Sequence, residues 1–445
     1  SVFAHYPVMD KTGLESRLAA ATEGFGSWSA AAIADRCAIF TSMATLLRRD
    51  TEKLAQLATR EMGKPIVDTR AEVEKCAALC EWNVEHGPAF LADEPTSVPD
   101  GKAWVSFRPL GIVLAVMPWN FPYWQAMRAA VPIMLGGNGL LLKPASNVVG
   151  CALELQRLWQ EAGLPGGTFS VLNVSHDSAL DLLDDSRIAA ATVTGSVKAG
   201  SAVAARAGKA IKKCVLELGG ADPFIVLDDA DIDAAVKAGI GSRYANAGQV
   251  CIAAKRFILE AGIAEKFTQK FVEATRALKI GDPLYENTNV GPMARADLRD
   301  ELHEQVTRSI EQGARLLLGG NAGDGAGNYY QATVLADVKP GMVAFDDELF
   351  GPVAALCVAR DADHAVELAN NSKFGLSGAL WSEDRERATV LAARMQTGAV
   401  FINGTSTSDT RVPIGGVKRS GFGRELSHFG LREFVNAQTV WLDRS

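Results

Sequence analysis

From residue 111 to about residue 400 the chain alternates short apolar runs with amphipathic helical segments. In the first half of this stretch the runs are of strand length and almost entirely apolar: Gly111–Met117, Leu140–Lys143, Ala190–Val193 and Val215–Leu218. Strands of this kind, separated by helices, form parallel sheets with helices on both faces. The alternation begins again with a helical segment over Asp231–Asn246. We therefore predict an α/β fold with two doubly wound units.

The rest of the chain departs from this alternation. Residues 12–90 carry apolar residues at intervals of three and four, which indicates helices. Turn residues at 99–101 precede the alternating run Ala103–Arg108, which is typical of an exposed hairpin, and Phe434–Trp441 predicts one more strand. A chain of 445 residues is long enough for two or three domains.

Composition argues against several classes of function. The formal net charge is −7, whereas binding of nucleic acid needs clustered Lys and Arg. The seven cysteines are odd in number and scattered, so we expect free thiols and a reducing, cytoplasmic compartment. The six histidines lie far apart, so we expect no metal site. We expect neither a membrane span nor a signal peptide, because the apolar runs are short and the first ten residues lack a basic, apolar pattern.

Three segments contain residue types suited to acyl chemistry. Cys251 ends the Gly-containing turn Asn246–Cys251. It is either a nucleophile or a buried cysteine that only fills a core. Glu217 lies in an apolar strand. It is either a general base whose proton affinity is raised by burial or a carboxylate that is paired at the end of the strand. Asn120, between two prolines, could donate a hydrogen bond to an oxyanion or cap the turn. A free thiol is mostly protonated at pH 7, so a catalytic Cys251 needs local activation.

Three further segments suit a dinucleotide. Lys143 and Ser146 follow a strand and could hold a ribose, although a solvated lysine is the alternative. Gly195 and Ser196 stand between a strand and a helix, where small residues suit a phosphate, but the segment matches neither Gly-x-Gly-x-x-Gly nor a P-loop. Glu348 is a second carboxylate, before a Phe-Gly-Pro turn.

Together and in this order, the six segments resemble the aldehyde dehydrogenase superfamily, from about residue 15 to the C-terminus. The loop Pro413–Gly421 resembles a signature of the same family. The resemblance implies that Cys251 is the nucleophile that forms a thiohemiacetal and then a thioester, that Asn120 belongs to the oxyanion hole, and that Glu217 activates water for hydrolysis. It also implies the residues that bind NADP or NAD: Trp119, Lys143, Ser146, Gly195, Ser196, Glu348 and Phe350.

The resemblance further implies the domain organisation. A Rossmann-like cofactor-binding domain is expected in residues 1–91 and 111–218, a catalytic domain in residues 219–412, and an oligomerisation arm in residues 92–110 and 431–445. In the family this arm pairs across subunits, and alone it would leave strand edges unpaired. We therefore expect a homodimer or homotetramer.

Within the superfamily, the sequence is most similar to short bacterial succinate-semialdehyde dehydrogenases. The stretches that carry this similarity are Arg60–Pro65, Leu216–Val226 and Gly421–Gly430. The similarity implies that Trp124, Arg128 and Ser408 bind the substrate, with Arg128 on its carboxylate. Longer relatives have a second arginine six residues before the nucleophile, where this chain has Ala245, and whether the nearby Arg243 replaces it stays open.

The expected cofactor, and the choice among rival activities, are argued mainly from a few individual residues. Ser146 has no charge to repel the 2′-phosphate of NADP, so we favour NADP, with NAD also accepted. If Arg128 only forms a salt bridge, the substrates would be uncharged aliphatic or aromatic aldehydes. Glu217 argues against a CoA-acylating relative, which needs no hydrolytic base. The combination of Cys251, Glu217 and Asn120 argues against a non-catalytic relative.

Overall fold

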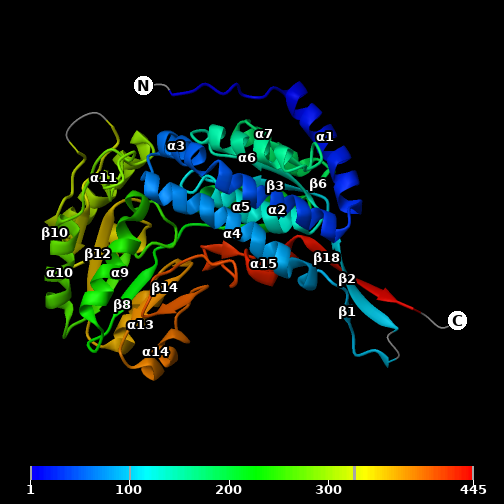
Figure 1. The fold of residues 1–445 in the computed structure, drawn as a ribbon. Coiled ribbons are helices and arrows are strands. Elements are labelled where there is room, and N and C mark those ends of the chain that lie inside the picture. Colours follow the sequence, from blue (N-terminus) through cyan, green and yellow to red (C-terminus); the bar gives the residue numbers. More distant parts are fainter. Residues whose placement is uncertain (1–2, 100–101, 324–326, 443–445) are drawn as a thin grey trace.

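The structure, a computed structural model, describes residues 3–99, 102–323 and 327–442. The turn predicted at Asp100 and Gly101 and the last three residues of the predicted arm, 443–445, lie outside these ranges. The described chain folds around two large sheets, with a narrow arm projecting from the body close to the C-terminal end (Figure 1).

The first sheet has six strands in the order β17-β7-β6-β3-β4-β5. All neighbours are parallel except β17, which runs antiparallel to β7. The strands are β3 (Ile112–Val116), β4 (Gly139–Lys143), β5 (Phe169–Val171), β6 (Ile188–Thr194), β7 (Lys213–Glu217) and β17 (Gly421–Phe422). In β3, Val113 and Ala115 join the core on one face, and Ile112 and Leu114 join the core on the other. Because both faces are buried, the strand is a continuous apolar run, as predicted.

Helices cover both faces of this sheet. One face packs against α2 (Ile33–Arg49), α3 (Thr51–Met62), α4 (Ile66–Phe90), α5 (Trp124–Leu135) and α6 (Val149–Glu161). The other face packs against α1 (Lys11–Ala30), α7 (His176–Asp181) and α8 (Val197–Lys209).

The start of α5 is fixed from outside the helix. A carboxylate oxygen of Glu72 on α4 accepts hydrogen bonds from the backbone N–H groups of Tyr123 (2.9 Å) and Trp124 (2.8 Å). These N–H groups have no partner inside the helix, so the carboxylate satisfies donors that would otherwise be lost on burial. The other oxygen of Glu72 forms a buried ion pair with Lys64. Through its bonds to Tyr123 and Trp124, Glu72 fixes the start of α5 and so the loop before it, which carries Asn120.

The second sheet has seven strands in the order β10-β11-β12-β9-β8-β14-β15, parallel except for β10. They are β8 (Pro223–Val226), β9 (Arg256–Glu260), β10 (Arg315–Leu318), β11 (Thr333–Ala336), β12 (Val353–Ala359), β14 (Gly378–Trp381) and β15 (Val400–Ile402). Helices α9 (Ile232–Tyr244) and α10 (Ala264–Arg276) cover one face, and the other face packs against α11 (Ala296–Glu311), α12 (Val343–Asp346), α13 (Ala362–Asn370) and α14 (Arg385–Ala392). The two doubly wound units are thus confirmed.

The arm is a three-stranded antiparallel sheet of β1 (Glu94–Pro95), β2 (Ala103–Pro109) and β18 (Val435–Trp441). β18 follows α15 (Ser427–Glu433) and pairs with β2 along all seven of its residues. A short pair, β13 (Phe374–Gly375) and β16 (Val417–Lys418), connects the second sheet region to the C-terminal loop.

Within the described ranges, no single helix is both long and apolar enough to span a membrane. Only α1 and α2 taken together meet the length and composition needed, and they are bent by 116° at the break between them.

Candidate active site

Four of the predicted site segments meet at one edge of the six-stranded sheet. The Asn120 loop follows β3, Lys143 ends β4, Gly195 follows β6 and Glu217 ends β7. These strands are neighbours and run parallel, so their carboxyl ends lie along the same edge. The segments are therefore brought together by the topology.

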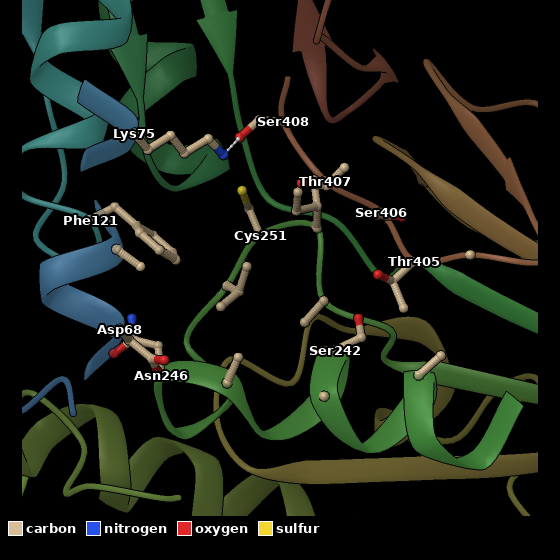
Figure 2. Close-up of a pocket in the computed structure, with 18 of the residues that line it drawn as sticks. Asp68, Lys75, Phe121, Ser242, Asn246, Cys251, Thr405, Ser406, Thr407 and Ser408 are labelled. Carbon is tan, nitrogen blue, oxygen red and sulfur yellow. Dashed lines mark hydrogen bonds between the residues drawn. The ribbon is translucent and has the colours of Figure 1, made fainter. Parts of the chain in front are cut away.

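The nucleophile candidate follows a strained turn. The helix predicted over Asp231–Asn246 ends earlier, at Tyr244, because Asn246 (φ 49°), Ala247 (φ 53°) and Gly248 (φ 73°) adopt left-handed backbone conformations. Such conformations are unfavourable for residues with a Cβ and persist where the surroundings enforce them. The turn directs the chain so that Cys251 faces a cavity (Figure 2).

Arg243 holds this turn from within the protein. Its guanidinium is fully buried and donates to the carbonyl oxygens of Gly248, Gly351 (2.9 Å) and Ala254 (3.3 Å). It does not line the substrate-side cavity, so it does not replace the arginine that is absent at Ala245.

Two cavities meet at Cys251. One, of about 720 Å³, is lined by α4, α5, α9 and the loop that follows β15. The other, of about 490 Å³, is lined by Asn120, Glu217 and several of the residues predicted to bind a dinucleotide. A sulfur at this junction can reach a substrate from one side and a cofactor from the other.

Burial favours the protonated form of both reactive groups at neutral pH. It raises the pKa of the Cys251 thiol to about 11, against the opposing effect of the Arg128 and Lys255 charges. It also raises the pKa of Glu217 to about 8, with Glu425 adding to the rise and Arg128 and Arg424 opposing it. One Glu217 oxygen, Oε1, is buried without a hydrogen-bond partner among the described residues. A carboxyl group of this pKa is suited to accept a proton near neutral pH.

Asn120 lies against the nucleophile loop. Its Nδ2 donates to the carbonyl oxygen of Gln249 (2.9 Å), and Asn246 Nδ2 donates to the carbonyl oxygen of Asn120 (2.9 Å). These bonds fix the amide beside Cys251, with one N–H left for an oxyanion.

The predicted cofactor residues are divided between two cavities that share Ser196. The 490 Å³ cavity is lined by Trp119, Gly195, Ser196, Glu348 and Phe350. A third cavity, of about 420 Å³, is lined by Lys143 and Ser196. Ser146 is exposed and lines neither of these cavities. An elongated ligand could therefore extend from Lys143 past Ser196 to Cys251.

Local geometry fits a dinucleotide along this path. Ser196 caps α8, with its Oγ accepting from Ala199 N (3.2 Å), and the N-terminus of a helix of this length favours phosphate. Glu348 lies so close to Gly219 that a Cβ there would be 2.1 Å from Glu348 Oε2. Glu348 also forms an ion pair with Lys255 (3.3 Å), whose Nζ donates to the carbonyl oxygens of Val250 and Cys251. Lys255 thus connects a predicted ribose ligand to the nucleophile loop.

The predicted substrate residues Trp124, Arg128 and Ser408 all line the 720 Å³ cavity, together with Ala245. Arg128 is buried and forms an ion pair with Glu425, a residue 297 positions later in the chain. Glu425 is brought there by β17, where Gly421 packs so tightly on β7 that a Cβ would lie 1.9 Å from the carbonyl oxygen of Leu216. Arg128 thus forms a salt bridge, as the alternative supposed, but a buried one and not one on the helix surface, and its contact with the substrate stays a prediction.

Three functional candidates were not identified from the sequence: Lys75, Lys255 and Glu425. Lys75 is one polar residue in a long helix, and the pattern of α4 gives no sign that it faces a cavity. Glu425 lies in a stretch that resembles the family, yet its pairing with Arg128 depends on tertiary contacts. Across the described ranges, no cluster of three or more His, Cys, Asp or Glu side chains could hold a metal ion.

Comparison with known proteins identifies the family of this chain. The sequence model of the aldehyde dehydrogenase family matches residues 1–440. The chain belongs to the aldehyde dehydrogenase family. It is 58% identical to the Escherichia coli protein named succinate semialdehyde dehydrogenase [NAD(P)+] Sad, over 97% of this chain and 93% of that protein. It is 45% identical to a probable NADP(+) succinate-semialdehyde dehydrogenase of Synechocystis, over 96% of this chain and 94% of that protein.

A solved structure gives the same result for the fold. The succinic semialdehyde dehydrogenase of Streptococcus pyogenes, in complex with NADP+, superimposes with a TM-score of 0.97 at 35% identity and covers 99% of this chain and 97% of its own. The predicted aldehyde dehydrogenase fold is therefore confirmed.

Proposed function

We propose that this protein oxidises succinate semialdehyde to succinate with NADP, and also with NAD. The observation that carries this proposal is the position of Cys251 between a cavity lined by cationic and hydroxyl side chains and a second cavity suited to a dinucleotide. Relatives that are 58% and 45% identical carry names with this substrate. Oxidation of other, uncharged aldehydes is the alternative, and it would use the same Cys251 chemistry.

In the proposed reaction, the Cys251 thiol passes its proton to solvent water as its sulfur attacks the aldehyde carbon, and Glu217 is kept for the later hydrolysis. Asn120 and the backbone N–H of Cys251 hold the resulting oxyanion. A bound nicotinamide supplies the hydride acceptor. Glu217 then removes a proton from the water that attacks the thioester, which releases the carboxylic acid and restores the thiol.

The cofactor contacts remain predictions, and the cavities support all of them except Ser146, which is exposed and lines neither cavity. Lys143 and Ser146 would hold the adenosine ribose, Gly195 and Ser196 the pyrophosphate, Glu348 the nicotinamide ribose, with Trp119 and Phe350 beside the nicotinamide. Trp119 and Phe350 make an edge-to-face contact with ring centroids 5.8 Å apart. On the substrate side, Trp124, Arg128 and Ser408 are the proposed contacts.

We also propose the domain division and assembly. Residues 1–91 and 111–218 would bind the cofactor, residues 219–412 would form the catalytic domain, and residues 92–110 and 431–445 the arm. The separate sheets of β3–β7 and β8–β15 support this division. The free edges of the projecting arm support a homodimer or homotetramer. The scattered free thiols support a cytoplasmic location.

Initial rates test the proposal. The purified protein is assayed with succinate semialdehyde and with butyraldehyde, an uncharged analogue, each with NADP and NAD. A preference of about 100-fold in kcat/KM for the semialdehyde is expected, equal to about 2.7 kcal/mol. Equal rates with both aldehydes would contradict the assignment of succinate semialdehyde as the substrate, but they would still agree with an aldehyde dehydrogenase activity. Activity that survives in Cys251→Ala would reject the mechanism.

A further inference from the structure

Lys75 and Ser408 meet at the wall of the substrate-side cavity. Lys75 Nζ donates a hydrogen bond to Ser408 Oγ (2.7 Å) and lies 4.2 Å from the centroid of the Trp124 ring. Both residues line the cavity that Cys251 also lines. In Figure 2 the Cys251 sulfur points towards the part of the cavity where Lys75 and Ser408 meet.

Among the residues that the structure describes, the Lys75 ammonium forms no ion pair with a carboxylate, although the side chain is partly buried. Burial and the Arg128 charge lower its pKa to about 8, against smaller opposing effects of Cys76, Asp409 and Glu72. A partly desolvated cation that contacts a hydroxyl and a ring, with the nearest carboxylates beyond ion-pair distance, is under-compensated, and an anion in the cavity would complete its interactions.

The other charged groups of this cavity are less suited to bind an anion. Glu72 is paired with Lys64, and Arg128 is paired with Glu425. Asp68 is an acid, and burial raises its pKa. Lys237, on α9, also lines the cavity but is exposed, so its ammonium keeps its water. Lys75 is thus the sheltered cation that has a hydroxyl beside it.

We propose that Lys75 is a specificity-determining residue that binds the distal carboxylate of the substrate together with the Ser408 hydroxyl. Ser408 Oγ accepts from Lys75, so its own proton is free to donate to the carboxylate. Lys75 would supply, from α4, the second cation that longer relatives carry at the position of Ala245. This inference rests on the proposed function, because it needs a substrate with a distal carboxylate.

The test compares variants by one ratio, kcat/KM for succinate semialdehyde divided by kcat/KM for butyraldehyde. Lys75→Met keeps the length of the side chain and removes the charge, and we expect the ratio to fall by about 10- to 100-fold. The fall should lie mainly in KM for the semialdehyde, because the carboxylate is remote from the reacting carbon. Lys75→Arg keeps the positive charge and should therefore retain most of the wild-type ratio. Lys237→Met, the matched control in the same cavity, should change the ratio by less than about threefold.

If Lys75→Met does not fold, Lys75→Gln keeps a donor to Ser408 and should lower the ratio in the same way. A wild-type ratio near one would overturn both the proposed function and this inference. A high wild-type ratio that persists in Lys75→Met and Lys75→Gln would overturn only the inference. If the ratio falls in Lys237→Met and not in the Lys75 variants, the inference would also be overturned, and the residue that binds the carboxylate would lie on α9.

Discussion

Replacing Glu217 with Gln should separate formation of the thioester from its hydrolysis. Glu217 lies at the end of β7, lines the same cavity as Cys251, and keeps one oxygen without a partner. Gln has the same shape but cannot accept a proton from water. We therefore expect Glu217→Gln to slow thioester hydrolysis on the order of 100-fold or more, within the usual contribution of a general base.

The pKa of Glu217 sets the size of the pH effect in the unmodified protein. With a pKa of about 8, roughly a tenth of the side chains are ionised at pH 7 and roughly nine tenths at pH 9. Only the carboxylate acts as a base, so the rate constant of hydrolysis should rise about tenfold from pH 7 to pH 9 and then level off. The pKa of Glu217 is raised because burial and the nearby Glu425 both disfavour the charged form of its carboxyl group.

Rapid mixing with succinate semialdehyde and NADP, followed by acid quench and mass spectrometry, measures the acyl group on Cys251. In Glu217→Gln the first turnover should produce NADPH and leave Cys251 acylated, with slow turnover afterwards. The reasoning fails if the variant hydrolyses its thioester at the unmodified rate. It fails equally if hydrolysis in the unmodified protein is independent of pH between 7 and 9.

Three other substitutions have distinct expected results. Arg128→Gln removes the partner of buried Glu425 and the proposed contact with the substrate carboxylate, so we expect kcat/KM to fall at least about tenfold with butyraldehyde and further with succinate semialdehyde; an unchanged kcat/KM with butyraldehyde would contradict a role in holding Glu425. Ser146→Asp places a negative charge where the 2′-phosphate is proposed to bind; kcat/KM with NADP should fall by about tenfold or more, and an unchanged NADP/NAD ratio would place that phosphate elsewhere. Arg243→Met leaves the carbonyl oxygens of Gly248 and Gly351 without a donor, which should cost about 3 kcal/mol and lower the melting temperature measured by calorimetry; an unchanged melting temperature would refute the role given to Arg243.

The positions of the strand-end residues could be predicted because they follow from chain topology. Asn120, Lys143, Gly195 and Glu217 each stand at or just after the end of an apolar run, and the runs predict strands of a parallel sheet. The structure shows that these strands are neighbours. Parallel strands bring their carboxyl ends to one edge, so local patterns are enough to predict a common site. The strands of the arm also follow from local patterns, because alternation over Ala103–Arg108 predicts the strand observed as β2, and Phe434–Trp441 predicts the strand observed as β18.

Other parts of the site depend on contacts that no local pattern encodes. The predicted helix over Asp231–Asn246 continued too far because Asn246 and Ala247 are compatible with a helix. Buried hydrogen bonds hold the left-handed turn, among them those of Arg243 to Gly248 and of Asn246 to Asn120. Lys75 faces a cavity because of the way α4 packs on α5. Glu425 meets Arg128 because β17 returns to the edge of the first sheet.

The electrostatics of the site give a reason why a nucleophile and a base can be buried together. A thiolate and a carboxylate in one low-dielectric cavity would repel each other, and each alone would lose its hydration. Burial raises the pKa of Cys251 to about 11 and that of Glu217 to about 8, so at neutral pH the resting pair is mostly neutral. Negative charge then develops mainly once an aldehyde carbon is present to bond to the sulfur, beside the Asn120 amide that can stabilise the oxyanion. The same burial that would deactivate an isolated cysteine therefore couples its ionisation to the arrival of the substrate.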